Sequence, residues 1–366
     1  MLDLLDYIHR NTLVLYICTL ILASSLSMYF VPALRKLATA KNFTDSPSAR
    51  KSHSSQVPFL GGVAIYLSTS LPLAFFSIFF FKDIMVSDTA LILGFGSLTL
   101  LVLGVIDDIN GLKPITKLIF QVAISFIVLY TLQVNICNMY GIFEIFALPT
   151  SISLTLSLFV YVIFMNMLNL IDGIDGLASG LSLTAFSFFA YVYYTTGNSF
   201  NMLICLASIG SLIPFIYYNM FSDKKIFLGD NGSLILGFIL GFLALDLLSS
   251  GYNIGNSLFS GHTPVVLMSL FSFPLVDTLR VFTIRTLRKR SPFSPDKNHV
   301  HHHLIRLGLS HRQATLIILV YTVFITSLSF FLLEVNINIA FVVLLTVASL
   351  CICLPAFLVK KIKSSN

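Results

Sequence analysis

The chain has 366 residues, of which 56% are hydrophobic and only 10% are charged, and its mean hydropathy is +0.91. A soluble globular protein carries about 25% charged residues, so this composition excludes a soluble domain and indicates an integral membrane protein. The net charge of +6 is interpreted as loop topology and lipid contact, with no nucleic-acid partner expected. Five cysteines without a CxxC pair do not indicate a disulfide framework.

Apolar windows predict eleven membrane-spanning helices, because each span needs about 20 apolar residues. The expected fold class is therefore all-α, a polytopic helix bundle that forms one integral membrane domain over residues 1–366. The first window is too long for a signal-peptide core and is interpreted as a retained helix. In chain order the predicted spans are Thr12–Val31, Gly61–Phe81, Thr89–Ile106, Ile115–Leu132, Ile152–Met167, Leu177–Tyr194, Phe200–Tyr218, Ser233–Leu248, Thr263–Thr283, Ala314–Leu333 and Ile337–Val359.

Basic residues are distributed very unequally between the two sides of this bundle. Twenty of the 22 Lys and Arg residues fall on the side that holds the loop 32–57, and only Arg10 and Lys82 fall on the other. Positive charge is enriched in cytoplasmic loops. The count therefore predicts that the first side is cytoplasmic, with the N-terminus outside and the C-terminus in the cytoplasm.

Acidic and glycine-rich motifs gather at the same predicted cytoplasmic boundary, whereas the acids of the opposite side are scattered singly. Helix N-termini at this boundary suit phosphate, and several carboxylates beside them suggest a divalent ion such as Mg²⁺. An Asp-Asp pair can also be only part of a solvated turn, and Ser233 can be only a helix cap. The motifs are "VPFLGG" (57–62), "DDINGLKP" (107–114), "NMLNLIDGIDGL" (166–177), "FLGDNGS" (227–233) and "SPFSPDKNHVHHH" (291–303).

Spacing within the third motif predicts a polar stripe. Asn166, Asn169, Asp172 and Asp175 follow one another at intervals of three, so a helical segment would place them on one face. Such a stripe would bind a metal or a hydroxyl-rich ligand.

The histidine run leaves three interpretations open. Zinc binding is one, but no cysteine accompanies the histidines and the spacing is not typical of a closed zinc site. An anion pocket fits the surrounding Arg and Lys residues better, and a basic loop on lipid headgroups is the third interpretation. The chain contains neither GxxxxGK[ST] nor GxSxG, so neither a P-loop nor an acyl-transfer triad is expected.

Taken together, these motifs resemble the polyprenyl-phosphate N-acetylhexosamine-1-phosphate transferases, and within them the bacterial undecaprenyl-phosphate GlcNAc-1-phosphate transferases. The resemblance runs from "VPFLGG" to "LIRLGLSHRQ". It implies transfer of N-acetylhexosamine-1-phosphate, expected to be GlcNAc-1-phosphate, from a UDP-sugar to undecaprenyl phosphate, with release of UMP. The implied setting is the bacterial inner membrane and the start of cell-surface polysaccharide synthesis, such as O-antigen, lipopolysaccharide or cell wall. The implied cofactor is Mg²⁺, with Mn²⁺ as a substitute.

The resemblance also assigns residue roles. It implies catalytic roles for Asp107, Asp108 and His299, and metal binding by Asn169 and Asp230. It implies substrate binding by a larger set: Lys51, Lys117, Asn166, Asp172, Asp175, His301, His302 and Arg312.

Two departures and several alternatives remain. The third histidine, His303, and the absence of a third acid from "DDINGL" depart from the family pattern. Muramoyl-pentapeptide and GalNAc-type phosphotransferases are alternatives within the family, and an ion-coupled transporter is the alternative outside it. The oligomeric state, a homodimer included, and the choice between one-step and two-step transfer stay open.

Overall fold

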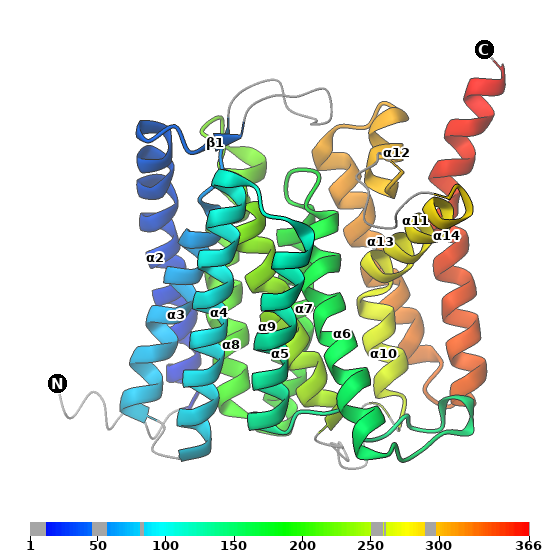
Figure 1. The fold of residues 1–366 in the computed structure, drawn as a ribbon, viewed down its shortest axis with the longest axis horizontal. Helices are drawn as coiled ribbons and strands as arrows, with labels where there is room; N and C mark the ends of the chain where they lie inside the picture. The colour runs from blue at the N-terminus through cyan, green and yellow to red at the C-terminus, as the bar shows by residue number, and fades with distance from the viewer. Residues whose placement is uncertain are drawn as a thin grey trace.

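The structure is a computed structural model that describes residues 12–45, 57–80, 84–249, 259, 261–289 and 298–365. Long α-helices run side by side through the bundle, and a short antiparallel pair, β1 (Thr44–Asp45) with β2 (Val57–Pro58), lies at its upper end (Figure 1). The helices are α2 (Thr12–Ala40), α3 (Gly61–Phe80), α4 (Ile84–Asn110), α5 (Pro114–Leu132), α6 (Thr150–Ile171), α7 (Leu177–Thr196), α8 (Ser199–Ile216), α9 (Gly229–Ser249), α10 (Thr263–Leu270), α11 (Ser272–Leu287), α12 (Val300–Arg306), α13 (His311–Phe331) and α14 (Ile337–Ser365), with short helical turns η1 (Ile142–Glu144) and η2 (Tyr217–Phe221).

The predicted all-α membrane bundle is confirmed. Within the described ranges, ten helices are long and apolar enough to cross a membrane, and a bent pair raises the number to eleven if it counts as one span. That pair, α10 and α11, occupies the ninth predicted span and is bent by 73°. Pro274, in the first turn of α11, has no backbone N–H, so the helical hydrogen bonds of α10 cannot continue past Phe271. A new helix, α11, therefore begins at Ser272.

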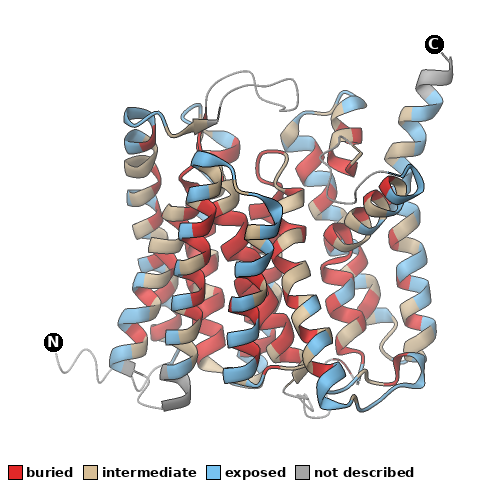
Figure 2. Ribbon diagram, viewed as in Figure 1, coloured by how far each residue is buried: buried red, intermediate tan, exposed pale blue. Residues whose placement is uncertain are grey.

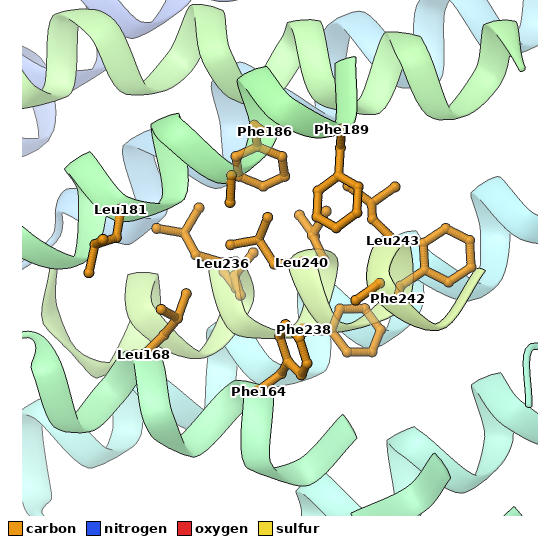
Figure 3. Close-up of a cluster of buried hydrophobic side chains, with 14 of the residues drawn as sticks. Phe164, Leu168, Leu181, Phe186, Phe189, Leu236, Phe238, Leu240, Phe242 and Leu243 are labelled. Carbon is orange, nitrogen blue, oxygen red and sulfur yellow. The ribbon is translucent and has the colours of Figure 1, made fainter. Parts of the chain in front are cut away.

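The core is centred on α9, of which 83% of the spanning window is buried, against 17% for α14 (Figure 2). Phenylalanine and leucine side chains from α6, α7 and α9 fill the space between these helices (Figure 3). Gly237 and Gly241 lie four residues apart, where added Cβ atoms would lie 2.6 Å from the Met165 backbone and 2.7 Å from Tyr161. Small residues at this spacing let α6 and α9 approach closely, as membrane helices commonly do.

Local signals in the sequence explain several helix ends. Pro114 opens α5, where its missing N–H costs nothing. Ser310 and Gln313 form a reciprocal capping box at the start of α13, and Gly197 ends α7 in the left-handed conformation. These ends fix the loops that carry the polar motifs.

Candidate active site

The side chain of Lys117 joins two carboxylates that lie far apart in the sequence. Its Nζ lies 2.7 Å from Oδ2 of Asp107, in the last turn of α4, and 2.8 Å from Oδ2 of Asp230, in the first turn of α9. The backbone N–H of Leu112 donates to the other oxygen of Asp107 at 2.5 Å. The second and fourth motifs of the sequence therefore meet at one cation.

Asp108 has a role that the sequence did not predict, because it caps a helix other than its own. Its carboxylate accepts from the backbone N–H groups of Asp230 at 3.0 Å and Asn231 at 3.1 Å, and from the Asn231 amide at 2.6 Å. The first N–H groups of a helix have no partner within that helix. The sequence offered Ser233 as a helix cap, but the oxygens that cap α9 come from Asp108 on α4.

Glycines explain how α3, α4 and α9 come close enough for these bonds. A Cβ on Gly62 would lie 2.2 Å from the backbone nitrogen of Gly232, and one on Gly104 would lie 2.3 Å from the Cα of Asn231. The N–H of Gly62 donates to the Leu228 carbonyl at 3.0 Å. The glycines of "VPFLGG" and "GDNGS" thus allow backbone-to-backbone packing.

The polar stripe predicted for the third motif is present only in part. Asn166 donates to Gln121 at 2.8 Å, and Asn169 donates to Ser233 at 3.0 Å, so both lie on the inner side of α6. The helix ends at Ile171, because the glycines that follow favour a turn, and the stripe does not continue through Asp172 and Asp175.

Asp172 nevertheless belongs to the same acidic cluster. Burial raises its pKa well above the ordinary value, and the negative charges of Asp230, Asp108 and Asp175 raise it further. Carboxylates from α4, from the turn after α6 and from α9 are therefore close enough to influence one another.

Asp175 is held by a separate set of contacts behind this turn. Its carboxylate pairs with Lys225 and lies 3.4 Å from Nδ1 of His311, and its carbonyl accepts from Thr315 at 2.9 Å. Burial alone would raise its pKa, but the hydrogen bonds from His311 and Lys225 outweigh burial and hold the pKa below the ordinary value. Asp175 is thus an ionised anchor for the turn.

Two residues that sequence reasoning missed complete the turn. The Asn219 side chain accepts from the N–H of Gly176, which has φ +76°, at 2.6 Å and donates to the Ile226 carbonyl at 2.8 Å. In the sequence, Lys225 contributes only to the excess of basic residues on one side of the bundle. In the sequence, the only sign of Asn219 is a polar residue among aromatic ones at the end of a predicted span.

Arg312, predicted to bind substrate, donates from Nε to the Met220 carbonyl at 2.8 Å.

The histidine motif is organised by a buried acid, Asp277, which is fully shielded from solvent. Oδ2 of Asp277 lies 2.9 Å from Nδ1 of His299, and Oδ1 lies 2.7 Å from Arg280 and accepts from the Val300 N–H at 3.1 Å. His299 is therefore held through Nδ1, and its Nε2 is the atom directed away from Asp277.

His301 connects this motif to the acidic turn. Its ring stacks on His299 with centroids 5.7 Å apart, and a Cβ on Gly173 would lie 2.4 Å from its Nε2. Burial lowers the pKa of His301 well below the ordinary value, and the neighbouring His302 lowers it further. The ring is thus neutral near pH 7. His302 follows in α12, with its ring centroid 4.3 Å from that of His301.

A metal would have to bind through a small set of oxygens. Across the described residues there is no group of three or more His, Cys, Asp or Glu side chains arranged as a metal site. Magnesium, however, is usually held by one or two carboxylates together with substrate phosphates. Asp107 and Asp230 already converge on one positive charge, and the buried Oδ1 of Asn231 has no hydrogen-bond partner in the described structure. This donor set fits magnesium.

Asp246 lies away from the acidic cluster. Asp246, near the opposite end of α9, accepts from Tyr193 and Asn201 at 2.8 Å each and ties three helices together. Lys51 lies outside the described residues. The other predicted site residues lie on the loops and helix ends described above, and their roles stay predictions.

An apolar helical bundle that brings acids and histidines together at one end defines an integral membrane enzyme. The profile of glycosyl transferase family 4 matches residues 90–248, which include every acidic motif but not the histidines. The resemblance stated from the motifs is confirmed, because this profile matches the part of the chain that carries the acidic motifs and because curated relatives bear the expected name.

Curated relatives agree with this assignment. A protein of Bacillus subtilis, named a probable undecaprenyl-phosphate N-acetylglucosaminyl 1-phosphate transferase, is 29% identical over 80% of this chain and 77% of its own length. The undecaprenyl-phosphate alpha-N-acetylglucosaminyl 1-phosphate transferase of Escherichia coli K12 is 25% identical over 82% of this chain and 78% of its own. The protein of the same name from Haemophilus influenzae is 29% identical over 78% of each. These names favour an enzyme over the transporter alternative.

Proposed function

We propose that this protein transfers N-acetylhexosamine-1-phosphate, specifically GlcNAc-1-phosphate, from a UDP-sugar to undecaprenyl phosphate and releases UMP. The observation that carries the proposal is the meeting of Asp107, Lys117 and Asp230 at one point, with Asp172 in the same acidic cluster. Phosphoryl transfer between two anions needs alignment and charge neutralisation more than a reactive side chain. A cationic centre flanked by acids at a helix N-terminus supplies both requirements.

Magnesium would bind through Asp230 and Asp107, with amide oxygens of Asn169 and Asn231 at hand. When bound, the ion neutralises charge on the phosphates that react. Lys117 holds both carboxylates in place before substrate arrives, and its ammonium supplies positive charge near the transferred group. Asp107 accepts the hydrogen bond from Leu112, which fixes its orientation.

His299 is proposed to contact the diphosphate. Because Asp277 holds its Nδ1, the ring presents Nε2 to the substrate, and in the imidazolium form, with both nitrogens protonated, Nε2 donates to a phosphate oxygen. Neutral His301, packed against Gly173, is proposed to position the sugar or diphosphate beside the acidic turn. Asp108 acts by fixing the start of α9 and hence the position of Asp230.

The proposed location is the bacterial inner membrane, with the site facing the cytoplasm. The charge count supports this orientation, since 20 of 22 Lys and Arg residues belong to the side that carries the acidic motifs. A nucleotide sugar from the cytoplasm and a lipid phosphate at the headgroup level can meet there. The whole chain is proposed to act as one transferase domain.

The test is UMP release by the purified protein supplied with undecaprenyl phosphate, Mg²⁺ and a panel of UDP-sugars. Release with UDP-GlcNAc that stops on chelation is expected. Asp230→Asn is expected to slow release strongly, whereas the matched Asp246→Asn, on the same helix but at its opposite end, is expected to retain it. The proposal fails if no UDP-sugar is turned over or if release continues without a divalent ion.

A further inference from the structure

A second polar feature lies at the upper end of the bundle, outside the acidic site. A cavity of about 380 Å³ opens between the end of α2, the β1–β2 pair, the segment after η2 and the start of α13. Three cations line it, Arg35, Lys225 and Arg312, together with one carboxylate, Asp223. The lining includes Arg312, to which the resemblance assigns substrate binding, but no member of the Asp107, Asp230 or histidine groups.

Hydrogen-bond donors in this cavity are incompletely used. The Nε of Arg35 is shielded from solvent and has no partner among the described residues. The Nε of Arg312 donates to the Met220 carbonyl. Its two terminal nitrogens make no hydrogen bond in the part of the chain that the structure describes. Lys225 pairs with Asp175, and an ammonium has three donors. A buried donor without a partner is costly unless a ligand or water satisfies it.

The excess of positive charge in the cavity favours an anionic ligand. Lys225 is already paired with Asp175, so Arg35 and Arg312 are the two cations left against Asp223, which is exposed and whose charge is therefore screened by water. Guanidinium groups bind phosphate oxygens through paired, charge-assisted hydrogen bonds. We propose that this cavity is a second anion site that binds a phosphate group, either a soluble phosphate or the headgroup of an anionic lipid.

The site is linked to the proposed active site through one residue. Lys225 lines the cavity and also pairs with Asp175, the anchor of the turn that carries Asp172. A phosphate in the cavity competes with Asp175 for this ammonium and thereby loosens the turn. Binding itself does not depend on the transfer reaction, so the two proposals can fail separately.

The experiment measures binding to the full-length protein in dodecyl maltoside with EDTA present, so that the acidic site repels phosphate. Radiolabelled inorganic phosphate is titrated by equilibrium dialysis, and labelled phosphatidylglycerol or phosphatidylcholine is scored for retention after detergent exchange. Arg35→Gln removes the unpartnered donor. Lys36→Gln is the matched control, since Lys36 is the next residue on α2, is exposed and does not line the cavity. Lys225→Gln is a second test variant, and circular dichroism verifies that each is folded.

Saturable binding at one site is expected, weakened about tenfold or more by Arg35→Gln, weakened also by Lys225→Gln and changed less than about twofold by Lys36→Gln. Binding of inorganic phosphate identifies a soluble ligand, and selective retention of phosphatidylglycerol identifies a lipid headgroup. The proposal is overturned if neither probe binds saturably, or if Arg35→Gln and Lys36→Gln bind alike.

Discussion

Replacing Asp108 with alanine is expected to destabilise the protein strongly, because this side chain caps the central helix. The carboxylate satisfies two backbone N–H groups of α9 and the side-chain amide of Asn231. Leaving a buried donor unsatisfied costs roughly 1–3 kcal/mol, and losing a helix cap costs about 1–2 kcal/mol. The two backbone donors and the amide are neighbours, so their contributions overlap. We therefore expect a loss of about 2–4 kcal/mol in the free energy of unfolding.

The assay is thermal unfolding in detergent, followed by circular dichroism, on Asp108→Ala and two companions. Asp108→Asn keeps one acceptor oxygen and is expected to lose about half as much. Asp107→Ala is the matched control, because Asp107 is adjacent on α4 but pairs with a partly exposed Lys117 that retains Asp230. Its cost is expected to be about 1 kcal/mol, because the only backbone donor that loses its partner is the N–H of Leu112, a half-buried residue on the loop after α4. Equal melting of Asp108→Ala and wild type, or an equal loss in Asp107→Ala, would refute the capping role.

Three further predictions concern the turn and the histidines. Because the pKa of Asp172 is raised on folding, its contribution to stability is present below the ordinary value of 3.8 and is lost as pH rises through the folded value. Asp172→Asn is therefore expected to raise Tm at pH 7 by a few degrees while UMP release falls, and a Tm below that of wild type would argue against it. Asp277→Asn is expected to slow release by about 10–100-fold, since it no longer orients His299, with the helix content of the circular dichroism spectrum unchanged. Gly173→Ala is expected to slow release by displacing His301, which would lie 2.4 Å from the new methyl group, whereas unchanged kinetics would place the histidines elsewhere.

The membrane bundle could be predicted from the sequence, because each spanning helix corresponds to a window of high hydropathy. The sequence also predicted that the acidic motifs would meet, since alternate helices begin on one side. The bend between α10 and α11 was not predicted, although Pro274 was a visible signal. The apolar window there was continuous, and hydropathy does not report direction.

Tertiary contacts account for what the sequence could not predict at the site. Nothing local distinguishes Asp107, which binds Lys117, from Asp108, which caps α9, because the difference lies in which neighbour each side chain faces. Likewise, the interval of three in the third motif predicts a helical stripe, but the glycines end α6 at Ile171. The support of the turn by Asn219 depends on the short helical segment η2, which has no periodic signal of its own.

The most direct measurement is a double-mutant cycle on UMP release with Asp107→Asn, Asp230→Asn and the double variant. These residues are separated by more than a hundred positions in the sequence yet share one ammonium group. Residues that act as one unit give strongly non-additive effects. We predict that the double variant is within about threefold of the slower single variant. If the two single losses multiply in full, the carboxylates act independently and the single site at the end of α4 and the start of α9 is contradicted.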